Sequence, residues 1–440
     1  MSGTQPTVGP DDGRAPISPG ARRTVLASFL GSLFEWYDFG IYGTTSAIVF
    51  DQVFFPKESP AVGTLLALTT AAVGYFTRPI GGIIFGHFGD RVGRKQLLVI
   101  TMLIMGIPTL IIGFLPGYAT IGILGPILLL LMRLVQGVGL GGEYAGAALA
   151  TIESVPRNRR GFFGSIPQLG NPIGGLLGAV LVLAATSIAG DDVYAAWLWR
   201  APFLISVVLL VYAMVVRLRL VETGDFHKLV EDRGVQKSPL ITVLRYHWRP
   251  LLLGLGARCA DAISGNIAIV PYIVTFLHLS NSTSLATTII PAIFAVPLML
   301  SMGAVSDRIG RKRMFVIGLC VLAVTVFPMF ALLNTKIFWL MVLGIVIMKL
   351  GNSTQFAVQS AFLSDVFPTE VRYTAISLVY QLTAIIGGLT GPACVAILIA
   401  ANGSPWPLAA AVTAAILVSV GCAIAMRTRV RSETMQPVQA

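Results

Sequence analysis

The chain has very little charge. Only 12% of its 440 residues are Asp, Glu, Lys or Arg, whereas a soluble domain averages about 25%. Hydrophobic residues make up 55% of the chain, and the mean hydropathy is +0.80. This composition excludes a protein whose surface is in water all round. It predicts a protein that crosses a membrane several times.

Cysteine and histidine are scarce, with four residues of each. The cysteines lie in apolar runs at irregular spacing, which excludes a metal-ligand pattern and a disulfide framework. No His-rich cluster is present, so we expect no metal, no cofactor and no membrane-embedded enzyme. The chain also lacks a Gly-x4-Gly-Lys-Ser/Thr motif, which argues against a pump driven by ATP.

The apolar residues form twelve segments that are long enough to cross a bilayer as helices, because a span needs about 20 such residues. A polar stretch separates the sixth segment from the seventh. We therefore predict an all-α membrane protein with an N-terminal bundle over 21–217, a cytoplasmic linker of short amphipathic helices over 218–249 and a C-terminal bundle over 250–426, flanked by a disordered tail (1–20) and a C-terminal tail (427–440). The spans are expected at 24–50, 62–86, 96–115, 121–148, 161–188, 198–217, 250–277, 285–305, 313–333, 337–360, 372–400 and 406–426.

The basic residues gather in alternate loops between these spans. The opposite loops hold almost none, only Lys57, Lys336 and Arg200. Since cytoplasmic loops are rich in Lys and Arg, this asymmetry places both termini in the cytoplasm. It also accounts for the net charge of +11 without a nucleic-acid partner.

Two sequence motifs recur in the two halves. "GHFGDRVGRK" (86–95) returns as "GAVSDRIGRK" (303–312), and an acid-x2-Pro-x3-Arg pattern occurs at 153–160 and again at 365–372. Both lie at the same place in each half, so the chain is a duplicated six-helix unit. The glycines permit a tight turn, the Asp can face the positive N-terminus of a neighbouring helix, and the arginines can bind acids at helix ends. We expect these contacts to break and re-form as the halves move: Gly86, Asp90, Arg91, Gly93, Arg94, Asp307, Arg308, Gly310, Arg311, Glu153, Arg160, Asp365 and Arg372.

The repeated loops resemble the signature of the major facilitator superfamily, over residues 24–426. "EWYDFGIYG", "TRPIGG", "GHFGDRVGRK", "RLVQGVGLGGEY" and "VETGDF" are together similar to its metabolite:proton symporter family, which carries citrate, 2-oxoglutarate, shikimate, and proline or betaine. One departure is Ala304, which stands where the first repeat has His87. The resemblance implies two pseudo-symmetric six-helix bundles, transport by alternating access, a plasma-membrane location and a monomer surrounded by lipid.

Several ionisable residues lie inside the spans, where each costs at least about 2.5–3.5 kcal/mol on insertion scales. Such residues usually mark a functional pathway. In the first span Glu35, Asp38 and Tyr42 share one helix face. Other charged or polar side chains within spans are Arg78, the group Arg133, Gln136 and Glu143, the pair Arg258 and Asp261, the stripe Lys349, Asn352, Phe356 and Gln359, and the pair Gln168 and Asn171 between two prolines.

The resemblance implies that the first, fourth, seventh and tenth spans line the central cavity. It matches Asp38 to the helix-1 proton site of sugar porters and Arg133 to the arginine that faces it. We therefore predict that Asp38 carries the coupled proton and that Arg133 tunes it. A static Asp38–Arg133 ion pair and Glu35 as the carrier are the alternatives. Glu143 is either a second proton site or the partner of Arg78.

The buried bases favour a carboxylate substrate, and we predict that Arg258 and Lys349 bind it. A local ion pair between Arg258 and Asp261 is the alternative. Gln168 and Asn171 bind a hydroxyl group or pack around a proline kink. The remaining predicted substrate-binding residues are Asp261, Tyr42, Gln136 and Asn352.

The expected function is proton-coupled symport of a small organic acid such as a mono- or dicarboxylate. Uptake of a zwitterionic osmolyte such as proline or betaine stays open because buried acids balance the bases. The osmolyte carrier of the family ends in a coiled coil, whereas about fourteen residues without heptads follow the last predicted span. A uniporter or a transporter-like sensor is a further alternative.

Overall fold

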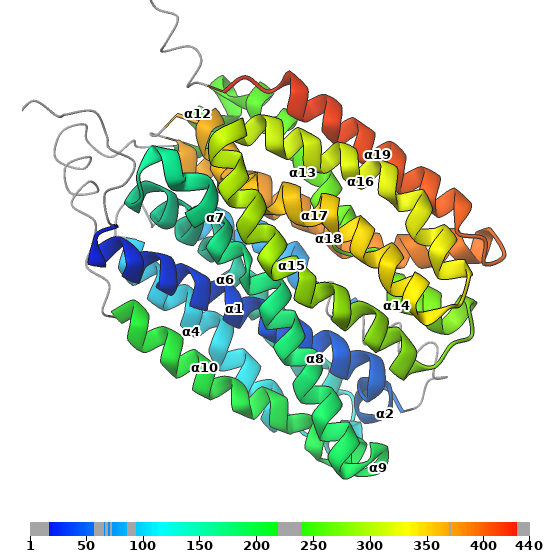
Figure 1. Ribbon diagram of the computed structural model, residues 1–440. Coiled ribbons are helices and arrows are strands. Elements are labelled where there is room, and N and C mark those ends of the chain that lie inside the picture. The colour runs from blue at the N-terminus through cyan, green and yellow to red at the C-terminus, as the bar shows by residue number, and fades with distance from the viewer. Residues whose placement is uncertain are drawn as a thin grey trace, which may run out of the picture.

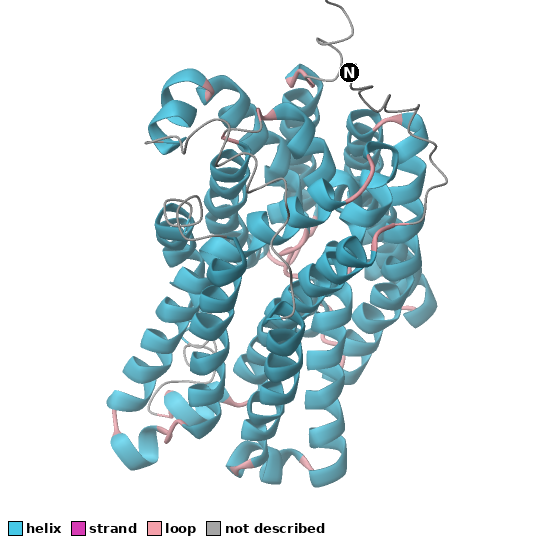
Figure 2. Ribbon diagram, turned by 90° about the vertical axis from the view of Figure 1, so that its left-hand side faces the viewer, coloured by secondary structure: helices cyan, strands magenta, loops and turns pink. Residues whose placement is uncertain are grey.

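The computed structural model describes residues 17–56, 66, 69–70, 73–85, 94–218, 239–368 and 371–428. These residues are helical nearly throughout, and Figure 2 draws no strand among them. The predicted calls at Gly86, Asp90, Arg91 and Gly93 lie outside the described residues, as do most of the linker and of both tails.

The first half is built around six long helical regions. They are α1 (Pro19–Ile48), helical residues 73–85, α4 (Arg94–Phe114), α6 (Leu124–Ser154), the consecutive helices α7 (Arg160–Gln168) and α8 (Gly170–Ala189), and α10 (Ala201–Leu218). Short helices α2 (Phe50–Phe54), α5 (Tyr118–Ile121) and α9 (Asp191–Ala196) and the 3₁₀ turns η1 (Arg157–Arg159) and η2 (Leu198–Arg200) connect them.

The second half begins with α12 (Pro239–Tyr246) and α13 (Trp248–Ser264). The short α14 (Ile269–Pro271), the π-helical turn η3 (Tyr272–Phe276), and the long helices α15 (Asn281–Ile309), α16 (Arg311–Asn334), α17 (Phe338–Val366), α18 (Arg372–Ala400) and α19 (Trp406–Ala425) follow. In Figure 1 the helices of the first half lie together on one side, and α16–α19 lie on the other.

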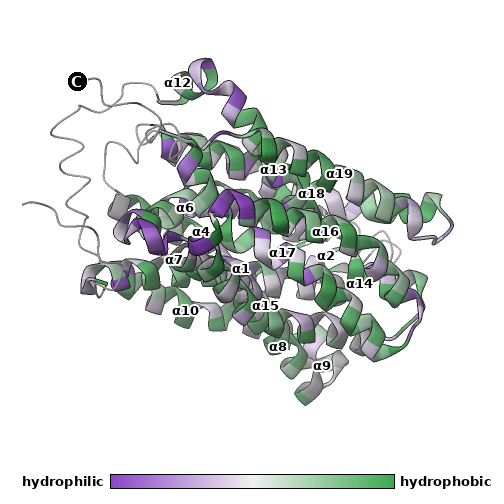
Figure 3. Cartoon of the chain, turned by 45° about the horizontal axis from the view of Figure 1, so that its top comes forward, coloured by the Kyte–Doolittle hydropathy of each residue, from purple (hydrophilic) through white to green (hydrophobic). Residues whose placement is uncertain are grey.

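The prediction of an all-α membrane protein is confirmed. Ten helices of the described chain are long and apolar enough to cross a membrane. Helix α1 and residues 73–85 lie at the two remaining predicted spans. Figure 3 colours most of the long helices hydrophobic, with strongly hydrophilic residues gathered toward the end near α12.

Two predicted spans are not single straight helices. The span at 161–188 is divided into α7 and α8 next to Pro167, where the proline removes a helical hydrogen bond. The span predicted at 250–277 is present, but its helix is interrupted, because α13 ends at Ser264 and α14 and η3 follow. There the Asn266 side chain donates a hydrogen bond of 2.9 Å to the Ala262 carbonyl and competes with the helical backbone.

Helix α12 lies within the predicted linker. Val243 is fully buried, whereas Ile241 and Leu244 are exposed.

Helix α1 begins at one end of the bundle, where the Ser18 side chain accepts a hydrogen bond from the Ala21 amide and Pro19 starts the helix. We call this end, where α19 also finishes, the terminal side.

The turn between α15 and α16 depends on Gly310, whose φ of 102° is open only to glycine at low cost. We expect Gly310→Ala to lower the free energy of unfolding by about 1–3 kcal/mol through backbone strain. Denaturant unfolding of the purified protein measures this change. Gly421→Ala is the matched control, because Gly421 lies inside α19 with open space around it and should lose nothing. Equal stability of the two variants would contradict the strain argument.

Candidate functional site

The centre of the first half holds a buried ion pair between Asp38 of α1 and Arg133 of α6. The Arg133 Nη1 atom lies 2.8 Å from Asp38 Oδ2, and both side chains are almost completely buried. Helices α1 and α6 pack directly against each other, which brings together two residues that are 95 positions apart in the sequence. The predicted pairing of these residues is therefore present in the structure.

Two more donors complete the environment of the Asp38 carboxylate. Thr109 of α4 donates a hydrogen bond of 2.8 Å to Oδ1, and Gln136 donates one of 3.2 Å to the same atom. The Arg133 guanidinium also lies 3.2 Å from the centroid of the Tyr42 ring, a cation–π contact. Tyr42 and Gln136 are thus part of this cluster, while Thr109 was not predicted. These donors stabilise a negative charge on Asp38.

Arg133 still has unused hydrogen-bonding capacity. Its Nε and Nη2 atoms are buried and have no hydrogen-bond partner within the described ranges. Nη1 alone serves both Asp38 and Gln136, with 2.8 Å to each. Because an unpaired buried N–H group is unfavourable, these atoms are available to a further acceptor.

Glu35 lies one turn before Asp38 and has a different partner. Its Oε1 atom is 3.8 Å from Nη1 of Arg78, which comes from helical residues 73–85. The Arg78 guanidinium lies over the rings of Phe39 and Tyr75, at 4.7 and 4.4 Å from their centroids. The two acids on one face of α1 are therefore held by different arginines from different helices.

Of the two alternatives for Glu143, a second proton site or a pair with Arg78, the structure does not show the pair with Arg78 among the described residues. Glu143 Oε1 instead forms an ion pair with Arg217, near the end of α10. Arg217 is fully buried and also donates a hydrogen bond of 2.7 Å to the Leu98 carbonyl. A Cβ atom at Gly31 would collide with both charged groups, so the pair fits only because α1 has a glycine there.

In the second half, Arg258 and Asp261 of α13 form a local ion pair of 3.5 Å. This local ion pair is the alternative, in the sequence-based prediction, to an Arg258 that is free to bind the substrate. The guanidinium also lies 3.8 Å from the centroid of the Tyr380 ring and donates to the Tyr380 carbonyl at 3.2 Å and to the Thr383 hydroxyl. Helix α18 therefore contributes two residues to this site that the sequence analysis did not name.

A chain of hydrogen bonds runs from Asp261 toward the first half. Gln355 donates to Asp261 Oδ1 at 3.1 Å and accepts from Gln359 at 3.4 Å. The Tyr380 hydroxyl in turn donates to Gln359 Oε1 at 2.6 Å. Each donor in this chain points toward the Asp261 carboxylate, which stabilises its negative charge.

The chain continues across the interface between the halves. Tyr144 of α6 donates a hydrogen bond of 2.7 Å to the Tyr380 hydroxyl. Gln168 of α7 donates to the Tyr144 hydroxyl and, at 2.5 Å, to Ser360 of α17. Gln168 therefore bridges the halves, whereas Asn171 forms no hydrogen bond with any described residue.

The remaining predicted substrate-binding residues lie on α17. Asn352 donates a hydrogen bond of 2.7 Å to Ser264 of α13. Lys349 is partly exposed and makes no hydrogen bond or ion pair within the described part of the chain. Its charge acts on Asp261 at longer range. Lys349 is thus a base inside a span, and the N–H groups of its ammonium are free donors within the described part of the chain.

The second repeat loop joins the halves on the terminal side. Asp307 accepts hydrogen bonds of 2.7 and 2.9 Å from the backbone amides of Gly161 and Phe162, at the start of α7. A carboxylate is favoured at a helix N-terminus. Arg311 lies 3.6 Å from Asp307, 2.9 Å from Asp365 and donates to the Arg157 carbonyl.

The acid-x2-Pro-x3-Arg pattern supplies further contacts on the terminal side. Arg372 of α18 lies 3.7 Å from Glu153 of α6, an ion pair between the halves. Arg308 is exposed, and the buried Nε atom of Arg160 has no hydrogen-bond partner. The backbone of Arg94 starts α4, and its side chain is outside the description. Together these contacts close the terminal side.

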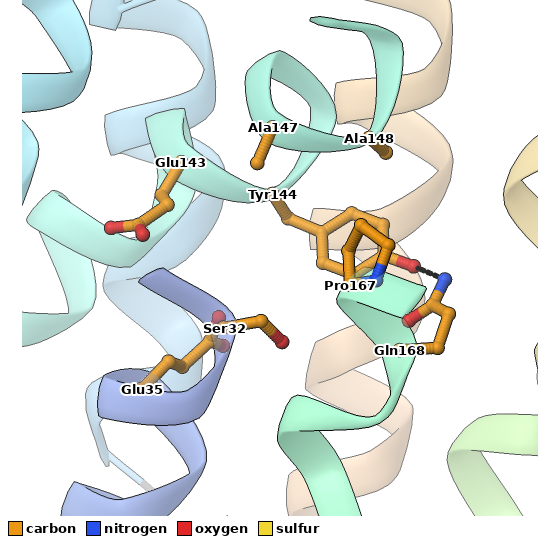
Figure 4. Close-up of a pocket in the computed structure, with 8 residues that line it drawn as sticks. All are labelled: Ser32, Glu35, Glu143, Tyr144, Ala147, Ala148, Pro167 and Gln168. Atoms are coloured by element: carbon orange, nitrogen blue, oxygen red, sulfur yellow. Dashed lines mark hydrogen bonds between the residues drawn. The ribbon is translucent and has the colours of Figure 1, made fainter. Parts of the chain in front are cut away.

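A small cavity of about 10 Å³ lies beneath this closed end, with room for about one water molecule. Ser32 and Glu35 of α1, Glu143 and Tyr144 of α6, and Gln168 of α7 line it, as Figure 4 shows. Within the described ranges no group of three or more metal-binding side chains is present. The site chemistry is therefore that of buried charge pairs and hydrogen bonds.

Comparisons with known proteins agree with this architecture. The family profile "Sugar (and other) transporter" matches residues 24–236, and "Major Facilitator Superfamily" matches residues 251–439. The shikimate transporter of Escherichia coli K12 is 36% identical to this chain, and the match spans 97% of this chain and 98% of the transporter. The inner membrane metabolite transport protein YhjE of the same organism is 37% identical, and the match spans 89% of this chain and 91% of YhjE.

Two further similarities extend the comparison. The proline/betaine transporter of Escherichia coli K12 is 35% identical over 86% of this chain and 77% of its own. The solved structure of the proton:xylose symporter XylE with 6-bromo-6-deoxy-D-glucose has a TM-score of 0.72 at 18% identity, covering 92% of this chain and 94% of XylE. At this identity the structural likeness shows the fold.

The buried Glu143–Arg217 pair generates a stability prediction. Arg217→Met leaves a buried carboxylate without its base, and we expect the free energy of unfolding to fall by about 3–5 kcal/mol. Adding Glu143→Gln removes the stranded charge and should restore most of the loss. Denaturant unfolding of both variants measures the effect. A double variant as unstable as the single one would contradict the pairing.

The Tyr144–Tyr380 contact generates a second prediction. Tyr380→Phe removes the hydroxyl that links the halves, a loss of about 1–2 kcal/mol that favours opening of the terminal side by roughly 5–30-fold. Ala361 of α17 is fully buried and faces Gly164 of α7 in the first half. The rate at which a water-soluble thiol reagent modifies Ala361→Cys, in a background without the native cysteines, therefore reports this opening.

The matched control for this experiment is Tyr272→Phe. The Tyr272 hydroxyl donates to Asn334 at 2.6 Å within the second half only, so the rate should not change. If Tyr380→Phe and Tyr272→Phe gave the same rate as the parent protein, the tyrosine contact would have no part in closure.

Proposed function

We propose proton-coupled symport of a small organic acid as the function of this chain, which belongs to the major facilitator superfamily. Members of this superfamily are transporters and not enzymes. The proposal includes alternating access by the two halves of one monomer, because both charged clusters lie within a single chain. It places the protein in the plasma membrane with the terminal side facing the cytoplasm, since basic residues gather there.

The observation that carries the proposal is the buried Asp38–Arg133 pair with its two unpaired guanidinium atoms, Nε and Nη2. A proton on Asp38 removes the negative charge that holds Arg133 in place. The guanidinium, which stays charged, then gains a free Nη1 in addition to the two unpaired atoms. Protonation of one acid thus changes the capacity of Arg133 to bind an anion.

An anionic substrate is supported by the arrangement of the bases. Within the described residues, Lys349 has free ammonium donors, and the Arg133 guanidinium has two nitrogen atoms, Nε and Nη2, without a hydrogen-bond partner. A carboxylate group suits both kinds of donor. The relative named as a shikimate transporter, which is similar over almost the full length, agrees with an organic acid.

A zwitterionic osmolyte is the second candidate. It is favoured by the local pair of Arg258 and Asp261, which offers opposite charges 3.5 Å apart to a molecule with a carboxylate and an ammonium group. The relative named as a proline/betaine transporter agrees with this alternative. Competition by each class of compound in the uptake assay below separates the two candidates.

In this mechanism the terminal side opens when its contacts between the halves separate. The bonds from Asp307 to the start of α7 and the ion pair of Arg372 with Glu153 break, and the first half rotates relative to the second. The glycine turn at Gly310 keeps the loop short enough for the contacts to re-form.

The proton role of Asp38 is tested by uptake into vesicles with an imposed pH gradient. Asp38→Asn should abolish accumulation of the acid above its outside concentration, because no proton is carried, while exchange of internal for external substrate continues. Asp38→Glu, which retains a carboxyl group, is the control and should keep part of the accumulation. A protonophore should reduce the parent protein to the level of Asp38→Asn. Full accumulation by Asp38→Asn would refute the assignment.

A further inference from the structure

The cavity between α1, α6 and α7 contains two carboxylates with unequal partners. Glu143 is bonded to Arg217 through Oε1, and its buried Oε2 atom has no hydrogen-bond partner among the described residues. In the same part of the chain Glu35 has only the 3.8 Å contact with Arg78, which is too long for a hydrogen bond. Both acids line the same small cavity, where Figure 4 shows Glu35 rising from α1 beneath Glu143.

A third polar atom of this cavity also lacks a partner. The Ser32 hydroxyl is buried and forms no hydrogen bond with the part of the chain that the structure describes. The cavity therefore has a free acceptor at Glu143 Oε2 and a free hydroxyl at Ser32, around a volume that suits one water molecule. Buried polar groups are rarely left unsatisfied, so the arrangement points to a polar occupant.

We propose that this cavity is a second proton-binding site, in which Glu35 holds a proton and a single water molecule bridges it to Glu143. The protonated Glu35 donates to the water, and the water donates to Glu143 Oε2 and accepts from the Ser32 hydroxyl. Two ionised carboxylates facing one cavity repel each other, and a shared proton removes that repulsion. Arg217 keeps the charge on Glu143, which leaves Glu35 as the acid that gains the proton.

The other charges around Glu35 leave this assignment intact. Arg78 from residues 73–85 and Arg258 from α13 favour the ionised form of Glu35, whereas Asp38 on the same helix and Glu143 on α6 oppose it. Arg78 is the nearer base, but its guanidinium is also engaged by the Phe39 and Tyr75 rings. The site shares α1 and α6 with the Asp38 cluster, but its arginines are Arg78 and Arg217 instead of Arg133. Its third helix is α7, whereas α4 completes the Asp38 cluster.

The position of the cavity relates proton binding to the closure of the terminal side. Tyr144 and Gln168 line it, and the same two side chains make hydrogen bonds across the interface to Tyr380 and Ser360. A proton in the cavity therefore sits one contact away from the bonds that hold the halves together. The proposal rests on proton-coupled transport as the function, and it adds a second proton-binding site besides Asp38.

Infrared difference spectroscopy on the purified, reconstituted chain tests the site without substrate or gradient. The parent protein should show a carbonyl band of a protonated carboxylic acid that titrates with pH, and Asp38→Asn should retain this band. Glu35→Gln should remove it. Glu153→Gln is the matched control, a glutamate on α6 outside the cavity, and should leave the band unchanged.

Two variants that keep Glu35 test the shared character of the site. Glu143→Gln removes the neighbouring negative charge, so proton binding should weaken about tenfold, and the titration should move about one unit to lower pH. Ser32→Val fills the cavity and removes the hydroxyl, and it should also move the titration of the carbonyl band to lower pH. Absence of a titrating band in Asp38→Asn, or persistence of that band when Glu35→Gln is combined with Asp38→Asn, would overturn the proposal.

A band that neither Glu143→Gln nor Ser32→Val shifts would also overturn it, because Glu35 would then titrate independently of the cavity. The proposed transport function fails in a different way, through uptake that ignores the pH gradient while the band persists. The two failures are therefore distinguishable.

Discussion

The cost of charge inside a membrane determines how the first half is assembled. Each buried acid lies next to a base from another helix: Asp38 next to Arg133, Glu35 next to Arg78, and Glu143 next to Arg217. Breaking a buried pair leaves an uncompensated charge, at a cost of about 3–5 kcal/mol. The three pairs connect α1, residues 73–85, α6 and α10, so any change in the charge of one acid is felt by the packing of two helices.

The second half uses its charges differently. Arg258 and Asp261 pair within one helix, and neutral side chains extend the contact: Gln355, Gln359 and Tyr380 lead from Asp261 to the interface. Lys349 keeps free donors. In the proposed mechanism the first half thus binds the proton, and the second half offers charge to the substrate. The hydrogen bonds through Tyr144 and Gln168 connect the two tasks at the closed terminal side.

The sequence predicted the helices well because long apolar runs have few alternatives, and it predicted the Asp38–Arg133 pair through family resemblance. Helical periodicity states which residues share a face but not which helix packs there. For that reason a pair of Glu143 with Arg78 stayed open beside a second proton site, and Arg217, near the end of α10, was not named as the partner of Glu143. Gln355 lies within the stripe that contains Asn352 and Gln359, so that signal was present. Thr109 offered none, because a threonine in an apolar span is common.

The central claim is that the charge of Asp38 decides whether the terminal side is closed. Distances between spin labels at Asn158 and Tyr246, in a background without the native cysteines, measure this directly as pH varies. Both positions are exposed and lie on different halves. The account predicts a short and a long distance whose proportions change with pH in the parent protein and stay constant in Asp38→Asn. The same pH dependence in both proteins would contradict it.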